Sequence, residues 1–283
     1  MTEPFPADVA RALDERRATG GLGSLAERLS YVSVVSSTND VAMELAAEGV
    51  PDGTAVFASR QSAGRGRLGR SWFSPSDSGL YLSVVFRDIR SALVTLLAGV
   101  AVAEGMRAAA RVQVELEWPN DLVVEPSPSS GARNGRLKVG GILSEASTVT
   151  AAGQAIVVGI GVNLSTAAYP DEIAFRATSL EAQAGRAVDR GVVLLEILES
   201  LMKWREQFVS DGGAAMLRRW TEMSPSSRGA MVEWTAAEGQ RTGVTDGVDS
   251  DGALRVRSDG RVERLLGGAL TWLPDREIDQ GGD

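Results

Sequence analysis

Residues Gln61–Trp72 combine glycine and arginine in a pattern that suits an anionic ligand. The segment reads Gln-Ser-Ala-Gly-Arg-Gly-Arg-Leu-Gly-Arg-Ser-Trp, so glycines and arginines alternate between Gly64 and Arg70. Arginine presents a planar fork of donors that matches phosphate or carboxylate oxygens. Glycine lets the backbone approach a ligand closely. The segment, called the clamp below, therefore predicts a flexible loop that closes on an anion.

Lysine is rare in this chain, which makes each lysine informative. Of the 29 basic residues, only Lys138 and Lys203 are lysines. A lysine kept against this preference is a candidate for a role that needs a compact ammonium group in a tight site. Chance retention is the alternative. We favour chance for Lys203, which lies in a helical stretch among charges, and a function for Lys138.

Composition excludes several kinds of chemistry. The chain has neither cysteine nor histidine, which rules out disulfides, thiol nucleophiles, Ser-His-Asp triads and imidazole-bound zinc. Any metal would be a hard, oxygen-bound ion such as magnesium. The net charge of −8 argues against nucleic-acid binding. We see no signal peptide and no apolar stretch long enough to cross a bilayer, so we expect a cytoplasmic protein.

The elements around the clamp can be read from apolar periodicity. Residues 36–39 (Ser-Ser-Thr-Asn) resemble the N-terminal cap of a helix, and taken alone they need be nothing more. Alternating and apolar runs predict strands at 31–35, 53–59, 80–86, 122–124, 137–145 and 154–163. Spacing of three and four residues predicts helices at 6–17, 91–112, 190–209 and 215–221.

The texture changes after residue 225. Five short β-like runs follow within about fifty residues, separated by Gly-containing turns, and this pattern predicts a small barrel. We therefore divide the chain into an N-terminal extension (1–30), a main domain (31–225), a small domain (226–275) and a tail (276–283). Residues 125–135 have the composition of a flexible hairpin tip.

Five motifs follow one another in the chain: Ser37-Thr38-Asn39, the clamp, Trp118-Pro119-Asn120-Asp121, Lys138–Glu145 and Gly159–Asn163. Taken together and in this order, they resemble the motifs of biotin protein ligases, over residues 31–273. The resemblance implies an α+β fold: a mixed sheet with helices, akin to class II aminoacyl-tRNA synthetases, followed by an SH3-like barrel. The strand-rich C-terminal pattern agrees with that expectation.

The resemblance implies a reaction in two steps. The biotin carboxylate attacks the α-phosphate of ATP, with Mg²⁺, to give biotinyl-5′-AMP and pyrophosphate. A lysine of biotin carboxyl carrier protein, or of the carrier domain of acetyl-CoA carboxylase, then attacks the adenylate and releases AMP. Because too few residues precede Tyr31 for a complete winged helix-turn-helix domain, we expect the monofunctional form, a monomer or weak homodimer that binds neither DNA nor membrane.

The resemblance also implies roles for individual residues. Biotin would be bound by Ser37, Thr38, Asn39, Gln61, Arg65, Gly66, Arg67 and Lys138. ATP would be bound by Arg65, Arg67, Arg70, Trp72, Asn120, Lys138 and Asn163. The catalytic residues would be Arg67, Lys138 and Asp121, and no residue is assigned to a metal. Asp121 would orient or deprotonate the incoming lysine, with an ordinary turn residue as the alternative.

One position departs from the family pattern. Glu117 precedes Trp118 where the family usually carries lysine, so either the position lies off the phosphate path or ATP binds more weakly.

Two alternative functions remain open. A lipoate–protein ligase would use the same fold and adenylate chemistry, although the complete clamp argues for biotin. A non-catalytic RNA-binding protein would use the clamp and the small barrel, although the acidic net charge argues against it.

Overall fold

The fold is known from a computed structural model. It describes residues 3–19, 27–89, 92–125, 136–149, 151, 153–166, 169–237 and 239–273. All but the first residue of the predicted hairpin tip, and the whole predicted tail, lie outside this set.

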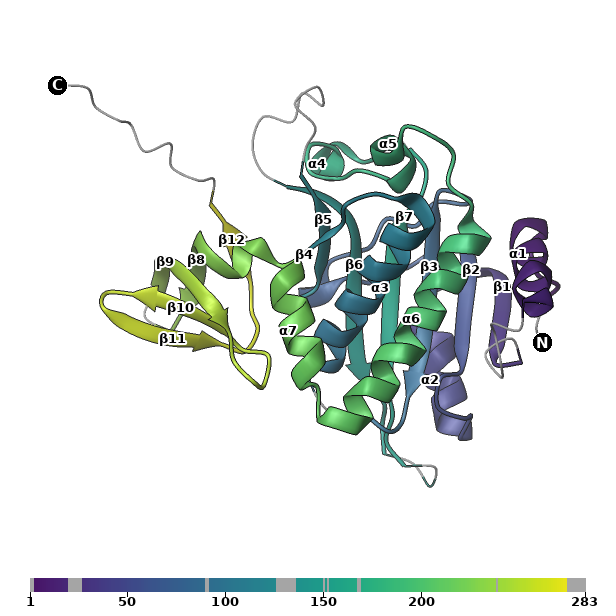
Figure 1. Ribbon diagram of the computed structural model, residues 1–283, viewed down its shortest axis with the longest axis horizontal. Helices are drawn as coiled ribbons and strands as arrows, with labels where there is room; N and C mark the ends of the chain where they lie inside the picture. The colour runs from purple at the N-terminus through teal and green to yellow at the C-terminus, as the bar shows by residue number, and fades with distance from the viewer. Residues whose placement is uncertain are drawn as a thin grey trace.

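A seven-stranded mixed sheet forms the centre of the main domain (Figure 1). Its order is β1-β2-β3-β7-β6-β5-β4, with β1 parallel to β2 and every other neighbouring pair antiparallel. The strands are β1 (Leu29–Val35), β2 (Ala55–Gln61), β3 (Gly79–Phe86), β4 (Glu115–Glu117), β5 (Asp121–Val124), β6 (Leu137–Ala146) and β7 (Ile156–Asn163).

Helices cover both faces of this sheet (Figure 1). On one face lie α3 (Val94–Ala110) and α6 (Arg190–Asp211), whose apolar residues join the sheet in the main core. On the other face, α2 (Thr38–Glu48) packs on β2, β3 and β7 through a smaller apolar cluster. That smaller cluster leaves part of the α2 face uncovered, which is where a cleft can form.

Helix α1 (Ala7–Ala18) packs on α6 and places Val9, Ala12 and Leu13 in the main core. The predicted N-terminal extension therefore contributes to the same core as the sheet. The remaining main-domain helices are α4 (Asp171–Ala174), α5 (Leu180–Ala184) and α7 (Ala214–Met223). None of the described helices is both long and apolar enough to cross a bilayer.

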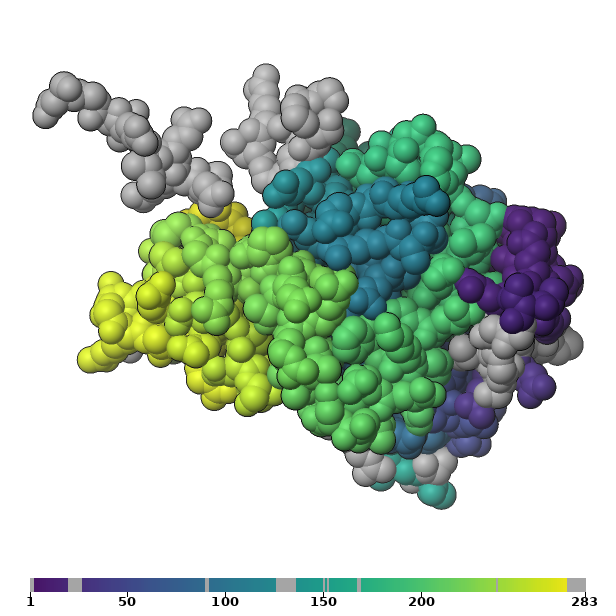
Figure 2. All heavy atoms as spheres, viewed as in Figure 1, coloured from purple at the N-terminus to yellow at the C-terminus, as the bar shows by residue number. Residues whose placement is uncertain are grey.

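A second sheet follows and forms a lobe at the end of the molecule opposite α1 (Figure 2). It is antiparallel, in the order β11-β10-β9-β8-β12. Among the described residues, the two edge strands β11 and β12 do not pair with each other. The strands are β8 (Arg228–Ala236), β9 (Gly239–Val248), β10 (Leu254–Ser258), β11 (Arg261–Leu265) and β12 (Leu270–Trp272). Together the two sheets confirm the predicted α+β class, and the short β-like runs after residue 225 lie in the second sheet.

The second sheet is joined firmly to the first. Val232, Trp234 and Val256 belong to the same buried cluster as the main sheet. In addition, the Trp118 indole N–H donates to the carbonyl of Gly252 at 3.0 Å. The turn that carries Trp118 is therefore fixed by contacts from both parts of the chain.

Candidate active site

A cleft of about 540 Å³ opens on the α2 face of the main sheet. Every residue that the sequence analysis assigned to biotin, ATP or catalysis lines it, whereas Ser62, Ala63, Gly64 and Gly69 of the clamp, which were assigned no ligand, do not. Residues Gly268–Trp272 of the second sheet line it as well. The fold therefore brings together motifs that are separated by more than a hundred residues in the sequence.

The polar end of the cleft is built on the start of α2. Ser37 caps the helix by accepting a hydrogen bond from the Asn39 backbone N–H, which confirms the predicted cap. The Gln61 side-chain oxygen accepts from the backbone N–H and the hydroxyl of Thr38 at 2.8 and 3.1 Å. The Ser83 hydroxyl lies 2.8 Å from that of Thr38 and 2.6 Å from Asn39 Oδ1. These buried groups form a network that suits an uncharged polar ligand.

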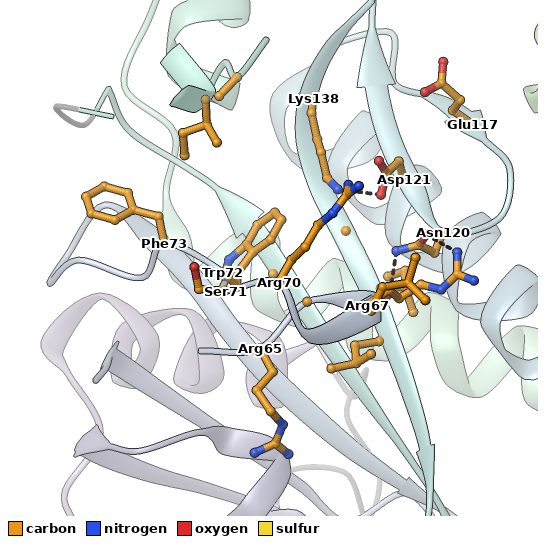
Figure 3. Close-up of a pocket in the computed structure, with 18 of the residues that line it drawn as sticks. Arg65, Arg67, Arg70, Ser71, Trp72, Phe73, Glu117, Asn120, Asp121 and Lys138 are labelled. Atoms are coloured by element: carbon orange, nitrogen blue, oxygen red, sulfur yellow. Dashed lines mark hydrogen bonds and ion pairs between the residues drawn. The ribbon is translucent and has the colours of Figure 1, made fainter. Parts of the chain in front are cut away.

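Arg65 lies next to this polar end and not beside the other arginines of the clamp. Its guanidinium forms ion pairs with Asp40 and with Glu145, and Glu145 also accepts from Asn39 Nδ2 at 2.6 Å. Figure 3 shows Arg65 directed away from the pair of Lys138 and Asp121. In this state Arg65 anchors the clamp to α2 and β6.

The clamp itself is a tight turn that closes on its own backbone. The Gly66 N–H donates to the Arg70 carbonyl at 2.7 Å, and Arg65 pairs with Ser71 in an isolated antiparallel bridge. Between them lies a short 3₁₀ turn in which Leu68 has φ of 57° and exposes its side chain. The arginine side chains are therefore held on the outside of a compact loop.

Arg67 reaches across the cleft to the turn after β4. Its Nη1 donates to Asn120 Oδ1 at 3.1 Å, and Asn120 Nδ2 in turn donates to the Ile142 carbonyl at 2.9 Å (Figure 3). Burial lowers the pKa of Arg67, with Asp121 opposing this shift, but a guanidinium stays charged at neutral pH. Arg67 thus ties the clamp to the Trp118–Asp121 turn.

Lys138 and Asp121 form an ion pair on neighbouring strands. Lys138 Nζ lies 2.5 Å from Asp121 Oδ1, and both side chains are about one-third exposed to the cleft. Lys138 Nζ also lies 5.4 Å from the centre of the Trp72 ring. The lysine predicted to be functional is therefore at the centre of the cleft, between a carboxylate and an aromatic ring.

Glycines on β7 make room for the site. Val158, Ile160 and Val162 point into the main core, so Gly159, Gly161 and Asn163 face the cleft. A β-carbon on Gly161 would lie 2.5 Å from the Trp72 indole, and one on Gly159 would lie 2.3 Å from Asn39 Oδ1. The glycines of the Gly159–Asn163 motif are therefore required because any larger residue would collide with Trp72 or Asn39.

Replacing Gly161 with alanine should displace Trp72 and weaken the fold. Because the new methyl group overlaps the indole, we expect a loss of about 1–3 kcal/mol in the free energy of unfolding. Urea unfolding followed by tryptophan fluorescence measures this loss. Gly99→Ala is the matched control, since its β-carbon would keep a normal 3.4 Å contact with Leu116. Equal stability of the two variants would contradict the steric role.

Asn163 serves the wall of the cleft. Its Nδ2 donates to the Thr178 carbonyl at 2.9 Å. The backbone of Lys138 also bonds to this segment, because its N–H donates to the Arg176 carbonyl at 2.7 Å. Asn163 thus helps to position the residues before α5 beside Lys138, in addition to its predicted contact with ATP.

Glu117 lies on the cleft wall and not away from it. Burial, aided by the nearby charge of Asp121 and opposed by Arg136 and Lys138, raises the pKa of Glu117 to about 7. Arg136 Nη1 lies 4.0 Å from Glu117 Oε2. Of the two explanations offered for this departure, a position off the ligand's path is therefore the less compatible with the structure.

The described residues offer little to a metal ion on their own. They contain no group of three or more acidic, histidine or cysteine side chains that could hold one. Asp121, a carboxylate that lines the cleft, is already paired with Lys138. Magnesium at this site would therefore be held mainly by phosphate and water oxygens, as is common for that ion.

Several residues of the site were missed by the sequence analysis. Ser83 does not line the cleft but contacts Thr38 and Asn39 beneath it. It was detectable, because it is a buried hydroxyl residue in the apolar run of β3. Arg136 and Arg176 carried no signal, since isolated arginines are usual in an arginine-rich chain. The contribution of Gly268–Trp272 depends on how the second sheet packs, which local sequence does not specify.

Comparisons with known proteins agree with this site. Residues 31–163 match the biotin/lipoate A/B protein ligase family. The chain is 32% identical over 247 residues to the bifunctional ligase/repressor BirA of Bacillus spizizenii, covering 85% of this chain and 73% of that protein. It is 30% identical over 281 residues to a biotin–[acetyl-CoA-carboxylase] ligase of Mycobacterium tuberculosis, covering 92% and 96% of the two chains.

A solved structure shows the same architecture. The biotin protein ligase of Aquifex aeolicus in complex with biotin and ATP superimposes with a TM-score of 0.73 at 28% identity, covering 87% of this chain and 98% of that one. The fold, the clamp and the sequence matches lead to one conclusion: this chain belongs to the biotin/lipoate A/B protein ligase family.

Proposed function

We propose that this chain is an ATP-dependent ligase that attaches biotin to a lysine of a biotin carboxyl carrier protein or carrier domain. The observation that carries the proposal is the arrangement of the cleft. A polar pocket formed by the uncharged side chains of Thr38, Asn39 and Gln61 adjoins a cationic region that contains Arg67 and Lys138. A small acid with a polar head group would place its carboxylate at the cations.

In the first step, a carboxylate oxygen of biotin attacks the α-phosphorus of ATP and the bond to pyrophosphate breaks. The carboxylate is ionised at neutral pH, so no histidine base is needed. The difficulty is the approach of two anions, and preorganised cations reduce this barrier. We propose that Arg67, Arg70 and Lys138 supply them. Magnesium, bound with the triphosphate, would offset further negative charge.

In the second step, the carrier lysine attacks the carbonyl carbon of biotinyl-5′-AMP, the bond to the phosphate oxygen breaks and AMP leaves. The attacking nitrogen must lose a proton as the amide forms. We propose that Asp121 orients this amine and accepts its proton, because the Asp121 carboxylate lies in the cleft at hydrogen-bond distance from another ammonium group, that of Lys138. We further propose that Trp72 and Asn163 contact the nucleotide and that Ser37, Arg65 and Gly66 complete the biotin site.

The polar pocket favours biotin over lipoate. The ring of biotin carries a ureido group with donors and acceptors, whereas the dithiolane ring of lipoate carries neither. A site lined by buried amides and hydroxyls discriminates strongly against a ligand that leaves them unpaired.

We propose a monomer or weak homodimer that acts in the cytoplasm and without DNA, as the sequence analysis expected.

The test is incubation with Mg²⁺, ATP and a recombinant carrier domain, with biotin or lipoate in parallel. We expect intact-mass measurement to detect a single biotin adduct on the carrier and no lipoyl adduct. Exchange of labelled pyrophosphate into ATP that depends on biotin but not on lipoate would report the first step alone. Exchange driven by lipoate, or by neither acid, would reject the proposal.

A further inference from the structure

A charged row lies on the wall of the cleft formed by β4, β5 and β6. Glu117 ends β4, Asp121 begins β5 directly opposite it, and Lys138 lies on β6. Arg136 immediately precedes β6 and also lines the cleft. Since Leu137 and Val139 point into the core, Arg136 and Lys138 project from the same face of the strand.

The contacts of Arg136 leave part of its guanidinium available. Its Nε lies 3.1 Å from Glu115 Oε2, which fixes the base of the group. Its Nη1 lies 4.0 Å from Glu117 Oε2, beyond hydrogen-bond distance. A guanidinium has five N–H donors in a plane. With Nε ion-paired to Glu115, the terminal nitrogens can still present a fork to a second anion in the cleft.

Glu117 is unusual in the same region, because it is an acid on the wall of a cleft that would receive a triphosphate. Its side chain is only 16% exposed. The part of the chain that the structure describes gives its carboxylate no hydrogen bond, only the distant contact with Arg136. An ionised carboxylate at this place would repel the phosphates, so the site must neutralise it.

We propose that Arg136 is a binding residue for the triphosphate of ATP, and that Glu117 takes up a proton when the nucleotide binds. The inference rests on the proposed function, because it assumes that the cleft receives ATP. In the free protein the ion pair with Glu115 holds Arg136 in place. On binding, Arg136 turns its terminal nitrogens to the phosphates, and the neutral Glu117 no longer opposes them.

The groups around Glu117 lower the free-energy cost of this protonation. The charged groups that face Glu117 are Glu115 on the same strand, Asp121 on β5, Lys138 on β6, and Arg136 immediately before β6. Because burial and the neighbouring carboxylates raise the pKa of Glu117 to about 7, this side chain can gain a proton near neutral pH. Added phosphate charge can only raise this pKa. The affinity for nucleotide should therefore fall as the pH rises from 7.

The first test measures binding of α,β-methylene-ATP, which cannot release pyrophosphate, and of adenosine. Arg136→Ala should weaken binding of the methylene analogue about tenfold and leave adenosine and biotin unaffected. Arg136→Lys should restore part of the affinity, because it returns the charge without the fork. The control is Arg261→Ala, which removes an exposed arginine of the second sheet outside the cleft.

The second test measures proton uptake by titration calorimetry in buffers of different ionisation enthalpy. Wild type should take up a fraction of a proton per α,β-methylene-ATP just above neutral pH, and Glu117→Gln should take up measurably less. The comparison of wild type with Glu117→Gln does not depend on the Arg136 variants. If Arg136→Ala fails to fold, Arg136→Gln takes the place of Arg136→Ala in the first test.

Two results would overturn the inference. One is unchanged affinity of the Arg136 variants for the methylene analogue, even if their stability falls, since Arg136 would then only join β6 to β4. The other is equal proton uptake by wild type and Glu117→Gln. Either result leaves the proposed function intact provided wild type still biotinylates the carrier domain, whereas a wild type that binds no ATP would reject both.

Discussion

Replacing Lys138 with alanine should slow the formation of biotinyl-adenylate by about 10³-fold. Its ammonium group is the compact cation at the centre of the cleft, paired with Asp121 and lying over Trp72. Removing it leaves the charge that develops on the phosphate without this partner, and leaves Asp121 unpaired. Biotin-dependent pyrophosphate exchange measures the step directly, and biotin binding by calorimetry shows whether the polar pocket survives.

The chain supplies a matched control for this variant. Lys203 is its other lysine, exposed on α6 beside Trp204, and Lys203→Ala should exchange pyrophosphate at the wild-type rate. Lys138→Arg tests the need for a compact cation, because a guanidinium is larger and planar. Full exchange activity in Lys138→Ala would show that Lys138 is not part of the reaction.

Replacing Arg67 with glycine should release the adenylate before the carrier arrives. Arg67 is the link from the clamp to Asn120, and its side chain is partly buried in the cleft. Losing a charge-assisted hydrogen bond and gaining a flexible residue should speed the release of biotinyl-5′-AMP by about tenfold or more. The free adenylate would then acylate exposed lysines on unrelated proteins.

The measurement is biotin incorporated into a bystander such as serum albumin, with the carrier domain absent. Arg261→Ala should label the bystander no more than wild type does, because Arg261 lies outside the cleft. If Arg67→Gly also labels at the wild-type level while still exchanging pyrophosphate, the clamp does not retain the intermediate.

Much of the fold was predictable because local patterns and packing agree. The alternation of β7 places valine and isoleucine in the core and glycine on the cleft, and the sequence already displays it. The cap at Ser37 was predictable for the same reason, since one side chain and one backbone N–H define it. Lys138 could be singled out because lysine is so rare here.

Other features depend on contacts that sequence separation conceals. Arg65 belongs to the clamp by sequence, yet Asp40 and Glu145 draw it to the polar end of the cleft. Arg136 gains its place from Glu115 and Glu117, which lie on another strand. A pattern of residue types identifies such side chains as cations, but the pairing of strands decides which anion each one meets.

The choice of cations in the cleft has a consequence for self-modification. Among the described lining residues, the positive charges come from Arg65, Arg67, Arg70, Arg136, Arg176 and Lys138. Guanidinium groups stay protonated and are therefore poor acyl acceptors, and the ammonium of Lys138 is held by Asp121. Lys203 lies on α6, across the sheet from the cleft. The mixed anhydride of the adenylate would thus be surrounded by cations that bind it but do not react with it. The acyl group therefore remains available to the carrier lysine, and the protein does not acylate itself.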